Sequence, residues 1–372
     1  MMGHPVWAEV SAGALTHNLL EVRRLVGRTA VMAVVKANAY GHGMVPAARL
    51  LVDGGADWLG VARGTEAVEL RRGGLAVPVL VLGYVDPGEC RELLEQNVRI
   101  TAYDAGSAAD VAAIARQHNK TLRLHVKVDT GMGRLGFPCD DPGVKVVLGV
   151  ARLPGVEVEG LFSHFACADE PDKKTTLEQL ERFHDFSRKL EMAGLPVRYR
   201  HTANSAGLIR FPEAHFDMVR PGLMLYGHFP SPQTCYGPDL RPAMTLKARV
   251  VQVKKAPKGF PVSYGWTYKT RGPEVLATVA AGYGDGFNRL LSGAGEVLLG
   301  GVRVPVAGRV CMDQIIVQAT AVKDVAPGDE AVLFGRQGDA FLPVEELAVR
   351  TGTISYEVLC AVSARVARVY VE

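Results

Sequence analysis

Apolar runs of strand length alternate with amphipathic helical stretches through the N-terminal part of the chain. Helical periodicity occurs, for example, at Thr65–Arg72, Glu89–Gln96, Ser107–His118 and Thr175–Met192. The expected strands are Val31–Ala37, Trp58–Ala62, Val77–Gly83, Arg99–Tyr103, Leu122–Asp129, Val156–Phe165, Tyr199–Asn204 and Met218–Gly227. Runs as apolar as these are typical of strands buried on both faces. This alternation predicts a TIM-like (β/α)8 barrel, although an open doubly wound sheet would also alternate.

The pattern changes after Phe229–Ala243, a proline-rich segment without periodicity that we expect to be a linker. Beyond it, short β-rich runs separated by turns predict a mostly-β domain. The expected strands there are Thr245–Val253, Val275–Ala281, Glu296–Leu299, Gln314–Gln318 and Glu330–Phe334. Only the segment around Val344–Arg350 has a helical pattern. We therefore expect a barrel over residues 1–235 and a C-terminal β domain over residues 236–372.

Composition narrows the class of protein. With 48% hydrophobic and 22% charged residues among 372, the chain has the composition of an ordinary globular protein. A net charge of +3, spread along the chain, indicates neither nucleic-acid nor membrane binding. The N-terminus lacks the basic and apolar segments of a signal peptide. The six cysteines form no ligand spacing, so we expect reduced thiols, a cytoplasmic protein and no metal site.

Polar residues follow the expected strand ends, where active sites of (β/α)8 barrels lie. The first strand ends at Lys36 in AVMAVVKANAYGHG, and Tyr40 follows four residues later. Such a lysine is either a solvated strand end or a desolvated amine whose lowered pKa makes it a nucleophile. Later strand ends contribute Arg134, Ser163-His164, Asn204-Ser205 and Arg220-Pro221-Gly222.

These residues are more informative together than singly. Ser205 opens an expected helix at a position where barrels commonly bind phosphate. Alone, such a serine is usually an N-cap, and His164 alone would be an ordinary core histidine. A lysine, a phosphate site and arginines at one barrel mouth suggest a pyridoxal phosphate (PLP) Schiff base.

One motif favours a different class of enzyme. The sequence from Gly131 to Gly136 matches GxGxxG and follows a strand, as in nicotinamide dehydrogenases. However, Arg134 would crowd a pyrophosphate loop, Pro138 follows at once, and the helical pattern resumes only near Asp141. We expect Arg134 to bind a carboxylate in bidentate fashion instead.

Lys127 stands two residues before the end of the fifth expected strand, where both faces should be buried. An unpaired ammonium there would be costly. Carbamylation would turn it into an anion able to hold Arg134, and burial and proximity are the grounds for this hypothesis.

The sequence resembles bacterial alanine racemases. The similar segments, in the family's order over nearly the whole chain, are VVKANAYGHG, VDTGMGRLGF, SHFACAD, HTANSAG, MVRPGLMLYG, VSYGWTY, GYGDGFNR, GRVCMDQ and TISYEVLC. The resemblance implies a PLP-dependent (β/α)8 barrel with a C-terminal β domain, acting as a head-to-tail homodimer. It also implies interconversion of L-alanine and D-alanine, which would supply D-alanine for peptidoglycan.

The resemblance implies catalytic roles as well. Lys36 would hold the cofactor and act as the base for D-alanine, and Tyr264, supplied to the partner's site, would be the base for L-alanine. A free phenol has a pKa of about 10, so Tyr264 would need cationic help from His164 and Arg220. Arg220 would also donate to the pyridine nitrogen and keep the ring neutral, which disfavours transamination.

Other positions are assigned by the same motifs. Arg134 would bind the substrate carboxylate with the backbone N–H of Met312 from the partner, and His164 would stack on the ring. The phosphate would be held by Ser205, Gly222, Leu223, Tyr40 and Tyr356. A narrow substrate corridor that favours a methyl side chain would contain Tyr283, Asp169, Arg289 and Arg309. Without the dimer, Met312 would be a core methionine and Arg289 a solvated charge.

Three alternatives remain besides the dehydrogenase. Another PLP-dependent amino-acid racemase would share these motifs. A barrel-type PLP decarboxylase would carry a Gly-rich phosphate loop and a cysteine-acid motif, and neither is visible. A non-catalytic PLP carrier would be a single barrel, which the expected β domain argues against.

Overall fold

The computed structural model describes residues 4–372, which form two compact units. The barrel unit comprises residues 14–39 and 44–241, and the β unit comprises residues 40–43 and 242–372 together with the described residues up to Gly13. The first three residues, part of the stretch without a signal-peptide pattern, lie outside the described residues. Within residues 4–372, no helix is both long and apolar enough to cross a membrane.

The barrel unit is built on a ring of parallel strands. Their order is β10 (Met218–Val219), β2 (Ala30–Val34), β3 (Trp58–Val61), β4 (Val79–Val81), β5 (Arg99–Ala102), β6 (Leu122–Asp129), β8 (Val156–Phe162) and β9 (Tyr199–His201). Two backbone hydrogen bonds link the segments that contain β9 and β10, the last two strands of the ring. The N–H of Asp217 donates to the Arg200 carbonyl at 3.1 Å, and the N–H of Arg220 donates to the Ala203 carbonyl at 2.9 Å. This nearly closed barrel confirms the predicted fold class and excludes an open sheet.

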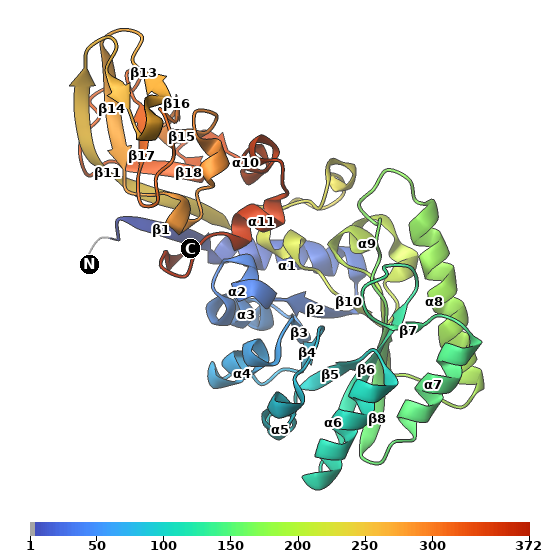
Figure 1. Cartoon of the computed structure of the whole chain (residues 1–372). Coiled ribbons are helices and arrows are strands. Elements are labelled where there is room, and N and C mark those ends of the chain that lie inside the picture. The colour runs from blue at the N-terminus through green and yellow to red at the C-terminus, as the bar shows by residue number, and fades with distance from the viewer. Residues whose placement is uncertain (1–3) are drawn as a thin grey trace. The chain divides into compact units, whose positions relative to one another are not determined.

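Helices alternate with these strands, and α3 to α8 lie around the outside of the barrel (Figure 1). They are α1 (Ala12–Val26), α3 (Met44–Asp53), α4 (Gly64–Arg72), α5 (Pro87–Glu95), α6 (Ala105–Gln117), α7 (Asp141–Ala151), α8 (Lys174–Met192) and α9 (Ser205–Arg210). Aspartate N-caps set the starts of α5, α6 and α7, where each carboxylate accepts a first-turn N–H. Strands β3 and β4 are buried along their whole length, as their continuous apolar runs predict, and β5 is buried although it contains Arg99 and Thr101.

The eighth predicted strand, Met218–Gly227, is wrong in its second half. Strand β10 ends at Val219, and the apolar residues that follow form the 3-10 helix η2 (Leu223–Tyr226). Pro221 lacks the N–H that a strand ladder requires, so the chain leaves the sheet there. The Tyr226 hydroxyl then donates to the Val34 carbonyl at 3.0 Å, which packs this turn against β2.

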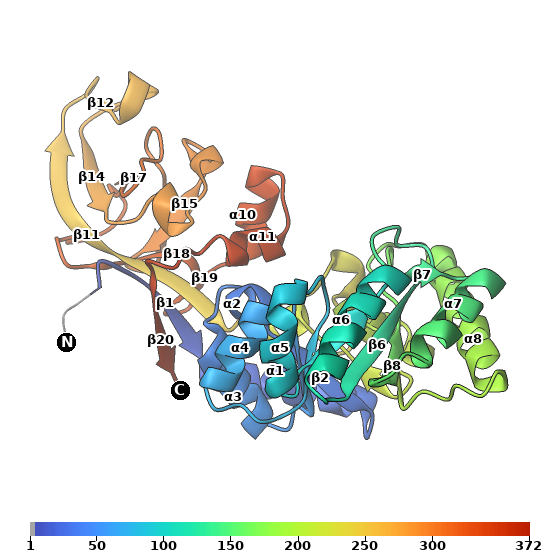
Figure 2. The same ribbon diagram turned by 60° about the horizontal axis from the view of Figure 1, so that its bottom comes forward.

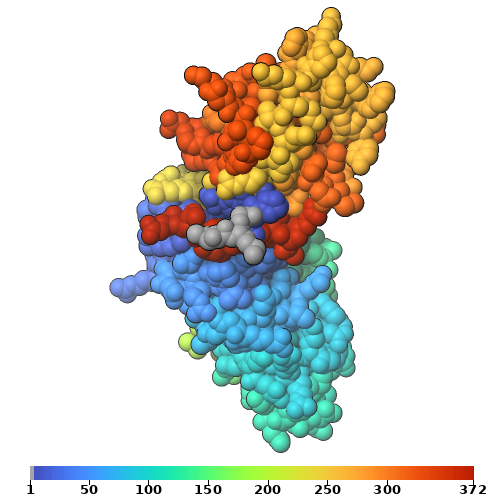
Figure 3. Space-filling model, turned by 90° about the vertical axis from the view of Figure 1, so that its left-hand side faces the viewer, coloured from blue at the N-terminus to red at the C-terminus, as the bar shows by residue number. Residues whose placement is uncertain are grey.

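The β unit contains a mixed sheet in the order β16-β15-β18-β11-β1-β20, and this confirms the predicted mostly-β domain. Its strands are β1 (Val6–Ser11), β11 (Met244–Ala256), β14 (Glu274–Val279), β15 (Glu296–Leu299), β16 (Val302–Pro305), β17 (Ile315–Gln318), β18 (Glu330–Gln337), β19 (Ala340–Leu342) and β20 (Ala367–Val371). A separate small ribbon pairs β12 (Pro261–Val262) with β13 (Tyr268–Lys269). The N-terminal strand β1 lies between β11 and β20 (Figure 2), and its blue atoms adjoin the yellow and red segments in Figure 3.

Two α-helices of the β unit lie near the C-terminus. The predicted helix at Val344–Arg350 is confirmed as α10 (Val344–Thr351). The expectation that it would be the only helical segment there is wrong, because α11 (Ser355–Cys360) follows it. Six residues are too few to show a helical period in the sequence.

Candidate active site

Lys36 follows β2 and begins the short segment α2 (Lys36–Tyr40), which is a left-handed turn. The φ angles are 52° at Ala37, 55° at Asn38, 53° at Ala39 and 52° at Tyr40. A residue with a Cβ in this region costs roughly 1–2 kcal/mol. Strain of this kind clusters at functional sites, because the surrounding structure must hold it in place. The stretch contains no glycine, so the sequence did not reveal this turn.

The carboxylate of Glu66 on α4 holds the turn that follows Lys36. One oxygen accepts the N–H of Ala37 at 2.7 Å. The other accepts the N–H of Ala62 at 2.7 Å and of Arg63 at 3.1 Å. Glu66 therefore joins the end of β3 to the residue after the lysine. Sequence reasoning missed it, because a glutamate in the first turn of a helix is an ordinary feature.

Cationic side chains converge around His164, as the strand-end argument predicts. Burial lowers the pKa of His164 well below its ordinary value, and the charges of Arg220, Arg134, Lys127 and Lys36 lower it further. The nearby carboxylate that opposes these charges at Lys127 is that of Asp129. A mouth with this excess of positive charge attracts an anion such as a phosphate or a carboxylate.

Lys127 is 3% exposed, which confirms the expected burial. Burial, followed by the charges of Arg134 and Arg220, lowers the pKa of its ammonium to about 8. The ammonium lies 5.8 Å from the centroid of the Phe162 ring. A substantial fraction of this amine is therefore neutral at slightly alkaline pH.

The loop that matches GxGxxG is organised around its own aspartate. One oxygen of Asp129 accepts the N–H groups of Gly131 at 2.9 Å, Met132 at 2.9 Å and Gly133 at 3.1 Å. Although partial burial tends to raise the Asp129 pKa, these three bonds keep it below its ordinary value. In a dinucleotide site such N–H groups would point at the pyrophosphate. Here the Asp129 carboxylate accepts them, so they are not available to a pyrophosphate, which excludes a dinucleotide site of the dehydrogenase kind. Arg134 is the exposed cationic group of this loop.

Ser205 joins two loops at the mouth of the barrel. Its Oγ accepts the N–H of Gly222 at 3.0 Å and of Met224 at 3.4 Å. The Asn204 side chain caps α9 by accepting the N–H of Gly207 at 2.9 Å. Ser205, Gly222 and Leu223 are therefore brought together, and the hydroxyl of Ser205 retains its proton as a donor.

Arg220 is buried and held by several acceptors. Its guanidinium donates to the carbonyls of His201 at 2.8 Å, Ser163 at 2.9 Å and Thr202 at 3.1 Å. It also contacts Nδ1 of His201 at 3.0 Å and Nδ1 of His164 at 3.2 Å. Burial and the charge of Arg134 lower the Arg220 pKa to about 9, so the group remains cationic at neutral pH. Because a guanidinium only donates, both imidazoles must accept at Nδ1.

The remaining predicted residues belong to the β unit, except for Asp169, which lies in the barrel unit. The rings of Tyr40 and Tyr356 have centroids 6.0 Å apart. Burial, then the neighbouring Tyr356 and Cys360, raises the pKa of Tyr40 far above its ordinary value, so its phenol stays a donor. Tyr264 is 69% exposed and Met312 is 53% exposed. Neither is a core residue of this chain.

Backbone contacts in the β unit join two of the expected corridor residues, Arg309 and Tyr283, to sequence neighbours of Tyr264 and Met312. Ser263, which precedes Tyr264, donates its hydroxyl to the Arg309 carbonyl at 2.6 Å. The N–H of Tyr283 donates to Cys311 at 3.0 Å, and the N–H of Gly284 donates to Met312 at 2.9 Å. Arg289 begins a 3-10 turn, η6 (Arg289–Leu291).

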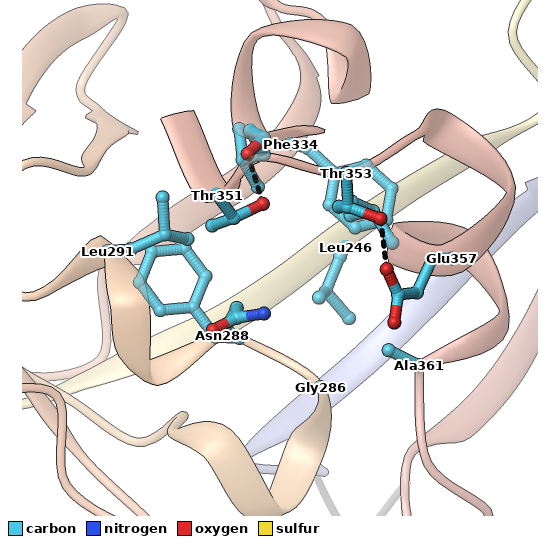
Figure 4. Close-up of a pocket in the computed structure, with 12 residues that line it drawn as sticks. Leu246, Gly286, Asn288, Leu291, Phe334, Thr351, Thr353, Glu357 and Ala361 are labelled. Atoms are coloured by element: carbon cyan, nitrogen blue, oxygen red, sulfur yellow. Dashed lines mark hydrogen bonds between the residues drawn. The ribbon is translucent and has the colours of Figure 1, made fainter. Parts of the chain in front are cut away.

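The β unit also contains a cavity of mixed character (Figure 4). Leu246, Leu291 and Phe334 give it apolar walls, while Asn288, Thr351 and Thr353 are polar. Its one carboxylate, that of Glu357, accepts a hydrogen bond from Thr353. No lysine, arginine or histidine lines it, so it lacks the charge that an anionic cofactor or a carboxylate substrate requires.

Family comparisons match both units. Residues 10–230 match the family described as alanine racemase, N-terminal domain, and residues 243–370 match alanine racemase, C-terminal domain. An alanine racemase of Desulforamulus reducens is 48% identical, and one of Methanococcus maripaludis is 43% identical. Each alignment spans 372 residues and covers 100% of both chains.

Solved structures give the same result. The alanine racemase of Clostridium difficile 630 superposes with a TM-score of 0.96 at 39% identity, covering 100% of this chain and 97% of the other. The Bacillus anthracis alanine racemase with bound L-Ala-P superposes with a TM-score of 0.95 at 36% identity, covering 100% and 96%.

Proposed function

Because this chain belongs to the alanine racemase family, we propose that the cationic barrel mouth around Lys36 and His164 is the site of its reaction. The chain is an isomerase that interconverts L-alanine and D-alanine with PLP as its cofactor. In this family D-alanine serves peptidoglycan synthesis. The observation that carries the assignment of the site is the cluster of Lys36, Lys127, Arg134 and Arg220 around one imidazole.

The residues at the mouth fit the cofactor. The Ser205 hydroxyl, held beside Gly222 and Leu223, is a donor suited to the phosphate, and we assign the phenols of Tyr40 and Tyr356 to the same role from their motifs. Arg220 is a fixed cation suited to the pyridine nitrogen. When bound through Lys36, PLP supplies the electron-withdrawing ring that acidifies the Cα–H bond of the amino acid.

Two bases on opposite faces of Cα are needed for racemisation. We assign the amine of Lys36 to D-alanine and the phenol of Tyr264 to L-alanine. The Arg220 cation favours the phenolate of a tyrosine brought near it. His164 does not supply the cationic help expected from the sequence, because burial and the surrounding cations lower its pKa well below the ordinary value. Arg134, on the loop built around Asp129, binds the substrate carboxylate with the Met312 N–H.

We propose that Tyr264 and Met312 act in the site of a second copy of this chain. Both side chains are largely exposed, and the neighbouring Trp266 is 65% exposed. Large apolar side chains gathered on one surface are typical of an interface. A head-to-tail homodimer would bury them and complete two equivalent sites.

We propose that Lys127 is carbamylated. CO2 reacts with a neutral amine, and the lowered pKa of Lys127 supplies one. The product is an anion among cations, and it would replace a costly buried charge with a partner for Arg134.

The deciding experiment measures D-alanine formed from L-alanine by the cofactor-loaded protein, with Lys36→Ala as the control. We expect conversion to an equal mixture of enantiomers and no conversion by the variant. If the wild type binds PLP but forms no D-alanine, the assignment of the reaction fails. If Lys36→Ala remains fully active, the site fails.

A further inference from the structure

A row of buried polar side chains on the barrel strands extends from Arg220, and none of the roles above uses the end of this row that lies away from Arg220. Arg99 on β5, His125 on β6, Glu159 on β8 and His201 on β9 are 7%, 0%, 6% and 0% exposed. Burying four such groups is costly unless each is paired. Their pairing is therefore informative.

The hydrogen bonds along this row of side chains all run in one direction. Arg220 donates to Nδ1 of His201 at 3.0 Å, which requires that a neutral His201 carries its proton on Nε2. That Nε2 lies 2.8 Å from Nδ1 of His125 and donates to it. His125 must then carry its own proton on Nε2 as well.

The outer proton of His125 points to a carboxylate. Its Nε2 lies 3.6 Å from an oxygen of Glu159 and, among the described residues, has no hydrogen-bond partner. Glu159 is in turn held by Arg99 through contacts of 2.9 Å and 3.4 Å. The row of side chains thus begins at the Arg220 cation and ends at one anion, the Glu159 carboxylate.

The charge states of His125, His201 and Glu159 agree with this direction of donation. Burial lowers the pKa of His125 and, together with Arg220, that of His201, so both imidazoles are neutral. Burial acts to raise the pKa of Glu159, but the facing His125 imidazole and the Arg99 guanidinium outweigh it and lower that pKa to about 2. The carboxylate is therefore ionised throughout the ordinary pH range.

The backbone makes room for the His125 ring. A Cβ at Gly160, the residue after Glu159, would lie 2.4 Å from Nδ1 of His125. The β6–β8 register also shifts between Leu124 and His125. A side chain at position 160 would displace the imidazole from its two partners.

We propose that Glu159 is a positioning residue that attracts the Nε2 proton of His125, stabilises the tautomers of His125 and His201 that accept from Arg220, and so supports the alignment of the Arg220 guanidinium. Arg220 at one end and Glu159 at the other require the same direction of donation, because reversing either imidazole would place two N–H groups face to face. The inference rests on the proposed role of Arg220 toward the cofactor ring. It adds that Glu159, at the other end of this row of side chains, supports that role.

The test removes the anion without leaving an unpaired charge. In the double variant Arg99→Leu/Glu159→Leu, His125 loses its acceptor and both buried charges disappear together. Gly160→Ala is a second variant that displaces the ring and keeps both charges. Asp217→Asn is the matched control, since it breaks another two-contact arginine–carboxylate pair, with Arg200 at 2.8 Å and 3.3 Å, outside this row of side chains.

Imidazole nitrogen NMR shifts report the tautomers directly. We expect both His125 and His201 of the wild type to be neutral with the proton on Nε2, and the two test variants to lose this single state. Transamination events per racemisation should rise about 10- to 100-fold, by analogy with the loss of activity when the outer partner of a metal-bound imidazole is removed. The control should change neither readout, even if its melting temperature falls.

The outcomes separate this inference from the proposed function. A wild-type His201 protonated on Nδ1, or folded variants with unchanged tautomers and partitioning, would overturn the role of Glu159. If the double variant does not fold, Gly160→Ala decides on the same readouts. If the tautomers shift but partitioning does not, the alignment of Arg220 has no catalytic consequence and the proposal is overturned. Failure of the wild type to racemise alanine would instead remove the proposed site.

Discussion

At the scale of single residues, Arg220 shows how one side chain sets the course of a reaction. It meets its neighbours only as a donor, and burial does not remove its charge at neutral pH. A hydrogen-bond donor at the pyridine nitrogen keeps the ring neutral. A carboxylate there would accept a hydrogen bond from a protonated nitrogen and so favour the charged ring. If Arg220 faces the pyridine nitrogen as we propose, its identity governs how long a carbanion survives.

Replacing Arg220 by glutamate should lower racemisation and increase transamination. The new carboxylate would stabilise a protonated ring, and a change of about 1.4 kcal/mol in relative barriers alters the partition about tenfold. Pyruvate released per D-alanine formed measures it, with Arg220→Lys as the charge-conserving comparison. Unchanged partitioning in a folded Arg220→Glu protein would contradict this account.

Lys127 carries the second prediction at this scale. Because its pKa is lowered to about 8, the amine is neutral above that pH and becomes protonated as the pH falls. Carbamate occupancy should therefore be high at pH 8 or above and decline below it. Mass measurement of the intact protein after gentle handling at several pH values checks this. Absence of any added mass at alkaline pH with bicarbonate present would rule the modification out.

At the scale of elements, the strand ends position the chemistry and the loops after them orient it. The left-handed turn after β2 depends on Glu66 from α4, and the loop after β6 closes on Asp129. In both cases a carboxylate satisfies backbone N–H groups that the strand no longer pairs. These loops are therefore built parts of the site.

The loop after β6 can be tested with two glycines. Gly136 has φ of 138°, and a Cβ there would lie 2.5 Å from the Asp129 nitrogen, while Gly133 has φ of 69° with nothing within 4 Å. Gly136→Ala should displace Arg134, raise KM for alanine more than it lowers kcat, and reduce the melting temperature. Gly133→Ala should cost only about 1–2 kcal/mol of stability. Equal effects of the two variants would show that the loop does not position Arg134.

At the scale of the whole molecule, the chain consists of two units, and several of the assigned residues differ in exposure between them. The barrel unit buries Lys127, Ser205 and Arg220, whereas the β unit exposes Tyr264 and Met312. Exposed residues of this kind act only when something covers them. A second copy of the chain is the partner that we propose.

Mixing two inactive variants tests the shared site. In a dimer of Lys36→Ala with Tyr264→Phe, one site would hold both changes and the other neither. Random assortment of the co-expressed chains should restore about one quarter of wild-type activity, because half the dimers are mixed and each has one intact site. Each variant alone is the control. No restoration in verified mixed dimers would mean that Lys36 and Tyr264 act within one chain.

The sequence by itself determined the alternation of strands and helices and the positions of residues at strand ends. Burial depends on which side chains avoid water, so apolar runs mark the barrel strands without knowledge of any contact. Strand ends then place Lys36, His164, Ser205 and Arg220 at one mouth, and the motif order indicates the family. Strand β6 was predicted with its observed bounds, Leu122–Asp129.

Only the tertiary structure decided the features that depend on distant partners. Glu66 holds Ala37 across 29 residues, and His125 meets His201 across 76. Pro221 ends the predicted strand locally, but the packing of the 3-10 turn η2 through Tyr226 on Val34, 192 residues away in the sequence, was visible only in the structure. Local patterns carry no information on such pairs, because a hydrogen bond depends on where two atoms lie in space. That is why the fold and the reaction were predictable, while the supports of the site were not.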